Sequence, residues 1–313
     1  MNLVVRVFPR IAFRATHDRL RDMKVRIANP LYDSVFKLLM ENLVIAGQFL
    51  SLLLDAEILE LSLHPQEQTH FNKAGTLHSK EGSIRVCRVD FNATVRFPDG
   101  ERRVLIELQK AMSSKVVGRF RRYLSVYYAI APQDSSPEHL PIITVYLLGF
   151  KLPTQLPTVI KVKRQYLNGS TGELLNNVRE PFIECLTHDS VLVQVPLINS
   201  DIPPANELEQ VLQIFDQHHR EGRDDDDENR RIMVVDDELG EKHPLLRKML
   251  RLLIYAACDE ETRLDMELED EAASLESELD EALKGKESER MQKEAALEEL
   301  AALRERMTQL GLT

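Results

Sequence analysis

Two segments of alternating polarity, joined by a turn, constrain the fold of this chain more than any other feature. From Val89 to Phe97 every odd-numbered residue is apolar and every even-numbered residue is polar. This period of two is typical of a strand with one buried face. Pro98-Asp99-Gly100 supplies turn residues, and the alternation then resumes up to Leu108. The pattern predicts a β-hairpin within a larger sheet.

The register of this hairpin decides which polar side chains are neighbours. With Asp99-Gly100 as a two-residue loop, apolar residues face apolar residues across the two strands. Asp90 is then predicted opposite Gln109, and Glu107 opposite Asn92. In that register Asp90 and Glu107 are diagonal neighbours on one face, with Cβ atoms roughly 7–8 Å apart.

Two carboxylates at this spacing suit a hard divalent cation. Mg²⁺ prefers carboxylate oxygens and keeps several of its waters, whereas two carboxylates without a positive neighbour repel each other. The alternative is an ordinary solvent-facing strand surface, on which acids and amides are common. The spacing alone favours that alternative.

Charge is distributed unevenly along the chain. The net charge is −11, yet residues 1–130 carry 20 basic and 13 acidic side chains, against 20 and 38 in the remainder. Such asymmetry indicates either a polyanion-binding part followed by an acidic tail, or only a solvated surface.

Composition also excludes several classes of protein. Three scattered cysteines argue against a disulfide framework and against a zinc site. The sequence has no apolar run long enough for a bilayer and no phosphate-cradling glycine loop, and we expect no secretory signal. We therefore expect a cytoplasmic protein without a membrane partner and without a nucleotide cofactor.

The chain divides into four parts by composition. Residues 1–22 are expected to be an N-terminal extension, with Met23 as a candidate start of translation. Residues 23–215 mix helical and strand-like segments and predict an α/β domain, in which helices flank a central mixed sheet. Residues 216–236 contain four consecutive aspartates and predict an acidic linker. Residues 237–313 predict a helical region, in which Gly285 favours a helical hairpin or short coiled coil over one unbroken helix.

Local signals place the individual elements. Asn29 followed by Pro30 predicts the N-cap and first residue of a helix. Periodicity predicts further helices at 44–54, 115–131 and 244–258, and strands at 58–63, 84–97, 102–110, 142–150 and 191–197.

Three motifs occur here in a recognisable order: Asn29–Lys37 first, then Asp90 with Ile106-Glu107-Leu108-Gln109, then Arg119–Leu124 with two tyrosines behind it. Together they resemble the PD-(D/E)XK nuclease superfamily, whose core is restriction-endonuclease-like. The similarity is greatest to its branch of nuclease-family transposases and recombination-promoting nucleases. It covers about residues 23–215 and leaves the C-terminal helices unexplained.

The resemblance implies a metal-dependent endodeoxyribonuclease that hydrolyses DNA phosphodiesters in recombination, mobile-element biology or defence. It implies that Asp90 and Glu107 ligate Mg²⁺, for which Mn²⁺ can substitute, together with the backbone carbonyl of Leu108. Asp33 would add an acidic ligand, directly or through water. An i,i+4 ion pair between Asp33 and Lys37 is an equal alternative.

One position departs from the superfamily pattern. A lysine often lies two residues after the glutamate, and this chain has Gln109, which can orient water or phosphate but carries no charge. Lys110 is expected on the opposite strand face, so Lys37 is the better candidate for a catalytic cation. The departure leaves a second function open: a weak or inactive nuclease fold that binds nucleic acid or a protein.

Two further surfaces are predicted to contact partners. Lys115, Arg119 and Arg122 follow each other at steps of four and three beside Tyr123, which predicts a basic helix face for the DNA backbone. A solvated helix face is the alternative. The C-terminal helices are expected to pair within one chain or to form a homodimer.

Overall fold

The computed structural model describes residues 24–63, 86–112, 120–121, 124–125, 140–176, 178–220 and 230–309. These residues belong to two compact units. The described residues up to Met266 belong to the first unit, and those from Glu267 onward belong to the second.

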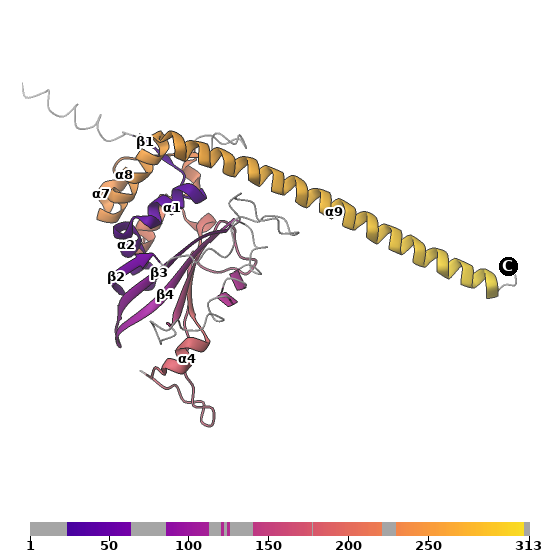
Figure 1. The fold of residues 1–313 in the computed structure, drawn as a ribbon, viewed down its shortest axis with the longest axis horizontal. Helices are drawn as coiled ribbons and strands as arrows, with labels where there is room; N and C mark the ends of the chain where they lie inside the picture. The colour runs from indigo at the N-terminus through magenta and orange to yellow at the C-terminus, as the bar shows by residue number, and fades with distance from the viewer. Residues whose placement is uncertain are drawn as a thin grey trace, which may run out of the picture. The chain divides into compact units, whose positions relative to one another are not determined.

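The first unit is built on a mixed six-stranded sheet (Figure 1). Its order is β2 (Glu57–Leu63), β3 (Val86–Phe97), β4 (Gly100–Ala111), β5 (Ile142–Leu148), β7 (Asp189–Gln194) and β6 (Val159–Val162). The β4–β5 and β5–β7 pairs are parallel, and the others are antiparallel. The predicted α/β class with a central mixed sheet is confirmed.

Helices α1 (Asp33–Glu41) and α2 (Leu43–Leu54) form the core together with one face of this sheet. Phe91, Ile106 and Leu108 point into that core and are fully buried. Because successive side chains of a strand point to opposite faces, Asp90, Glu107 and Gln109 lie on the other face of the sheet.

Among the described helices, none alone is long and apolar enough to cross a membrane. Helices α1 and α2 meet that test only as a pair, and this pair is bent by 95°.

Helix α1 does not begin at Pro30 as predicted, because the side chain of Asn29 has other partners. Its Oδ1 accepts a hydrogen bond from Leu31 N at 3.0 Å, which makes a local turn. Its Nδ2 donates to Gln217 Oε1 at 2.9 Å and to the Arg230 carbonyl at 2.8 Å. Asn29 thus ties the entry of α1 to distant segments, and the helix starts at Asp33.

A second, two-stranded sheet pairs β1 (Lys24–Ala28) with β8 (Ile232–Asp236) in antiparallel register. Residues 232–236 were predicted as part of an acidic linker, so this strand is a difference from the sequence-based expectation. The strand buries Met233 and Val235 against the core. Strand β8 is short and lies close to the run of four aspartates. It was therefore not predicted from the sequence.

Helices α7 (Leu239–Lys242) and α8 (Pro244–Cys258) complete the first unit. Helix α8 contacts β1, α1 and α2. It has the bounds predicted from its periodicity, with Pro244 at the first position and the His243 side chain accepting from Leu245 N. Its buried stripe consists of Leu245, Leu246, Met249, Leu250, Leu253 and Ala256.

Short elements make the remaining connections. Helices α4 (Pro181–Leu186) and α5 (Glu207–Leu212) flank β7 along the chain, and 3₁₀ helices occupy Val195–Leu197, Gln213–Phe215 and Gln217–His219.

Helix α9 runs without interruption from Glu260 to Gln309 (Figure 1). The prediction of a hairpin at Gly285 is therefore wrong. A single glycine inside a helix costs only about 1 kcal/mol relative to alanine. Strong helix formers surround it, and the sequence contains no proline after Pro244.

Candidate active site

The β3–β4 hairpin pairs Asp90 directly with Glu107. Phe97 pairs with Gly100, so Pro98-Asp99 is the turn, and the predicted register is wrong by two residues. A shift by two keeps every side chain on its predicted face, so the apolar pattern alone could not distinguish the registers. Gly100 has a φ of 131°, which side-chain-bearing residues rarely adopt, and it belongs at the end of the turn.

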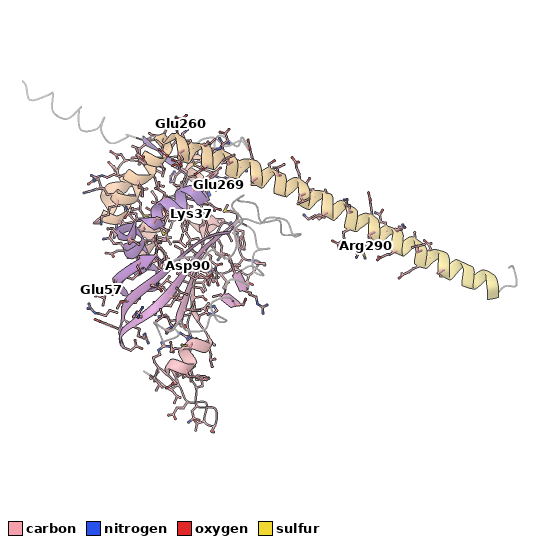
Figure 2. All side chains as sticks on the ribbon, viewed as in Figure 1. Lys37, Glu57, Asp90, Glu260, Glu269 and Arg290 are labelled. Carbon is pink, nitrogen blue, oxygen red and sulfur yellow. The ribbon has the colours of Figure 1, made fainter. Side chains whose placement is uncertain are left out.

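The corrected register brings the two carboxylates closer than predicted. Directly opposed residues have Cβ atoms about 4.5–5.5 Å apart, rather than the longer diagonal separation. Asp90 is 2% exposed and Glu107 is 0% exposed. Figure 2 labels Asp90 on β3. The acid pair therefore lies within the covered part of the sheet and not on a solvated strand surface.

Gln109 belongs to the same group. Its Nε2 donates to Glu107 Oε1 at 2.5 Å, and its side chain is fully buried. Its Oε1 is also buried, and no hydrogen bond to it is found among the described residues. Gln109 thus orients Glu107 while keeping one acceptor that water or a ligand could use.

Two hydroxyl-bearing strands continue this polar face. Thr144 lies opposite Glu107 in the parallel β4–β5 register, and Tyr146 lies opposite Gln109. The Thr144 and Ser190 hydroxyl oxygens are 2.7 Å apart. These residues were not predicted as part of the site, although Thr144 and Tyr146 are the polar members of an otherwise apolar strand.

An aromatic contact covers part of the same face. The Phe120 and Tyr146 ring centroids are 4.8 Å apart, and both side chains are nearly buried. Leu124 packs with Leu105 and Ile142 on this side of the sheet. The site is therefore bounded by apolar side chains.

Asp33 and Lys37 do not pair as the alternative suggested. Asp33 Oδ1 lies 2.5 Å from Lys110 Nζ, which also donates to the Leu31 carbonyl. Lys110 is 2% exposed and, by alternation, lies on the face opposite Gln109, as predicted. Lys37 is exposed on α1 (Figure 2). In the described part of the chain, no three acidic, histidine or cysteine side chains form a metal-binding group.

The remaining predicted site residues fall into two cases. Leu108 is buried in a strand that is paired on both sides, and it lies between Glu107 and Gln109 along β4. The proposed DNA-contacting residues lie outside the described residues; they are Lys115, Arg119, Arg122 and Tyr123.

The donor set fits a hard cation. Mg²⁺ is usually held by one or two carboxylates and keeps several waters, so a group of three acids is not required. Asp90 and Glu107 would supply the two carboxylates, with the Leu108 carbonyl as the further donor that the family resemblance implies. Oxygen donors of this kind do not favour zinc, which prefers histidine and cysteine.

A charged cavity of about 420 Å³ lies elsewhere, against the α2 side of the sheet. Arg164 there donates to Asp189 Oδ1 and to Glu184 Oε2, both at 2.9 Å. Arg179 and the Tyr166 hydroxyl also contact Glu184, at 3.2 and 2.6 Å. Burial and the hydrogen bond to Glu184 raise the pKa of Tyr166. These matched charges indicate a structural network.

In the contiguous segment His188-Asp189-Ser190, the carboxylate and the hydroxyl have separate partners. Asp189 pairs with Arg164, while Ser190 bonds to Thr144 on the other face. Burial, followed by the charge of Arg164, lowers the pKa of His188. The segment therefore does not form a hydrolase triad.

Comparisons with models of protein families, with curated proteins and with solved structures found no match to this chain.

Proposed function

We propose that this chain is a Mg²⁺-dependent endonuclease of the PD-(D/E)XK type that hydrolyses phosphodiester bonds in DNA. One observation carries the proposal: Asp90 and Glu107 are buried at directly paired positions of adjacent strands. Like charges directly opposite each other are destabilising, and a divalent cation held between them removes that cost.

Each residue of the group then has a distinct task. Asp90 and Glu107 hold the cation, with the Leu108 carbonyl as a further donor. Gln109 fixes the orientation of Glu107 through its amide, and its Oε1 can accept a hydrogen bond from the attacking water. When bound, the cation would activate that water and stabilise charge developing on the phosphate.

Plasmid cleavage tests the proposal. Wild-type chain, Asp90→Asn and Glu107→Gln are incubated with supercoiled DNA and Mg²⁺ or Mn²⁺. Both substitutions keep the side-chain shape, so we expect folded variants whose nicking rate falls by at least on the order of 100-fold. Chelation of the metal should abolish wild-type nicking.

Glu101→Gln is the matched control. Glu101 lies on the same strand and is exposed in an ion pair with Arg96. Its replacement should leave nicking unchanged. Equal activity in wild type and Asp90→Asn would contradict the proposal.

A second candidate is a nuclease-like fold that binds nucleic acid or protein without cleaving it. Two features favour this candidate. Gln109 stands where the superfamily often has a lysine, and Asp90 and Glu107 are almost completely buried. It predicts DNA binding by wild type without cleavage under any divalent metal. A fluorescence-anisotropy titration with labelled DNA, run beside the cleavage assay, separates the two functions.

A further inference from the structure

Helix α9 carries an exposed heptad pattern. Leu268 and Leu275 occupy one core position of the repeat, and Ala272 and Leu279 occupy the other. The three leucines are 50%, 66% and 47% exposed in chain order. An apolar stripe of this kind on a helix is typical of a surface that a second helix covers. From Glu267 to Gln309 the helix is on the order of 65 Å long at 1.5 Å per residue.

Charged residues occupy the same core positions in the middle of α9. Continuing the repeat places Lys286, Glu289 and Lys293 at successive core positions. In a parallel, in-register pair each of them would face its own copy, which buries three layers of like charge. A parallel dimer is therefore disfavoured.

An antiparallel pair with its centre between Glu287 and Ser288 removes this conflict. Lys286 of one copy then faces Glu289 of the other, twice by symmetry. Ala282 faces Lys293, whose long aliphatic stem can pack against the small alanine.

The same register matches side-chain size further out. Leu279 faces Ala296. A large side chain thus meets a small one without a shift of register.

The flanking charges favour the same orientation. Residues 267–282 contain eight acidic and no basic side chains. A parallel pair would place these segments beside each other. The antiparallel pair places each beside residues 293–308, which contain three basic and four acidic side chains. Repulsion between the strongly acidic segments is then avoided.

We propose that two copies of this chain associate through α9 as an antiparallel coiled coil centred between Glu287 and Ser288. The proposal is independent of the nuclease activity. A closed, two-fold arrangement of this kind is the commonest form of homo-oligomer.

The first test measures association of the full chain. Light scattering during size-exclusion chromatography should give the mass of a dimer. Lys286→Glu places like charges opposite each other in both central layers and should weaken the dimer at least about tenfold. The double variant Lys286→Glu with Glu289→Lys restores opposite charges and should recover the affinity. A monomeric wild type, or a Lys286→Glu dimer of unchanged affinity, would overturn the proposal.

The second test determines orientation by disulfide formation. Chains carrying Ala282→Cys should not cross-link to each other through that residue, because the antiparallel arrangement separates the two copies of position 282. Mixing them with Lys293→Cys chains should give a 282–293 disulfide, identified by peptide mass so that native cysteines do not interfere. A 282–282 disulfide in the single variant would show parallel pairing and overturn the proposal. Circular dichroism of each variant checks that α9 remains helical.

Discussion

The side-chain amide of Gln109 contributes orientation where a lysine would contribute charge. By donating to Glu107 Oε1 it leaves the other carboxylate oxygen in a defined direction. Buried side chains held by such bonds need little reorganisation when a ligand arrives. Gln109 was predicted as a site residue from its position after the glutamate, but its hydrogen bond to Glu107 is seen only in the structure.

Asp216 is a buried acid outside the candidate site. We expect its contribution to the free energy of unfolding to be lost at acidic pH. Burial alone would raise its pKa, but hydrogen bonds from the backbone and side chains of His218 and Ser200 lower it overall. Ser200 N lies 2.6 Å from Oδ2, and His218 N lies 3.0 Å from Oδ1. A lowered pKa in the folded state stabilises the protein above the unfolded pKa of about 3.9.

Asp216→Asn should therefore cost about 1.5–3 kcal/mol of unfolding free energy at neutral pH. The difference from wild type should shrink as the pH falls below about 4, because the unfolded carboxylate takes up a proton there while the folded one stays charged until a lower pH. Urea unfolding at several pH values measures this, with exposed Asp201→Asn as the control. A difference that stays constant down to pH 3 would contradict the assignment.

At the scale of elements, the Arg164 network holds the segment between β6 and β7. Arg164 is 14% exposed and Glu184 is 8% exposed, and both are paired. Replacing Arg164 with Met removes the cation that pairs with Asp189 and leaves Glu184 with Arg179 alone. We expect a loss of about 3 kcal/mol in the free energy of unfolding.

Arg96→Met is the matched control for that variant. Arg96 also contacts two carboxylates, those of Glu57 and Glu101, but it is 50% exposed. Solvent screens such pairs, so its loss should change stability far less. Equal destabilisation by the two variants in urea titrations followed by circular dichroism would refute the structural role of the Arg164 network.

Strong periodicity made most elements predictable. Helix α8 has the predicted bounds, and the alternation of β3 and β4 assigned Asp90 and Glu107 correctly to one face. The register was not predictable, because shifts by two residues keep the same faces and only the turn separates them. The start of α1 was missed because Asn29 bonds to residues distant in sequence.

At the scale of the molecule, the first unit extends well beyond the predicted end of the α/β domain. Strand β8 supplies the hydrogen-bonding partner of β1, and α8 buries six apolar side chains. Burial of each large apolar side chain contributes about 1.5–3 kcal/mol. Their sum is comparable with the entire stability of a typical domain, which is about 5–15 kcal/mol.

A fragment ending at Phe215 should therefore fail to unfold cooperatively, whereas one ending at Met266 should retain a sharp thermal transition. Far-UV circular dichroism during heating compares the two. Equal transitions in both fragments would show that β8 and α8 are dispensable.

The limits of prediction at this scale have a physical cause. The contact between β1 and β8 joins residues at the two ends of the unit, and local periodicity contains no information about such a pairing. The same holds for the ion pair between Asp33 and Lys110, whose partners lie on different elements.

The pairing of β1 with β8 also has a consequence during synthesis. Lys24 leaves the ribosome long before its partner Asp236 is made. At about 5–20 residues per second, the first strand waits roughly 10–40 s for the second. Throughout that interval the nascent chain presents an unpaired strand edge, which is a substrate for chaperones and a nucleus for aggregation.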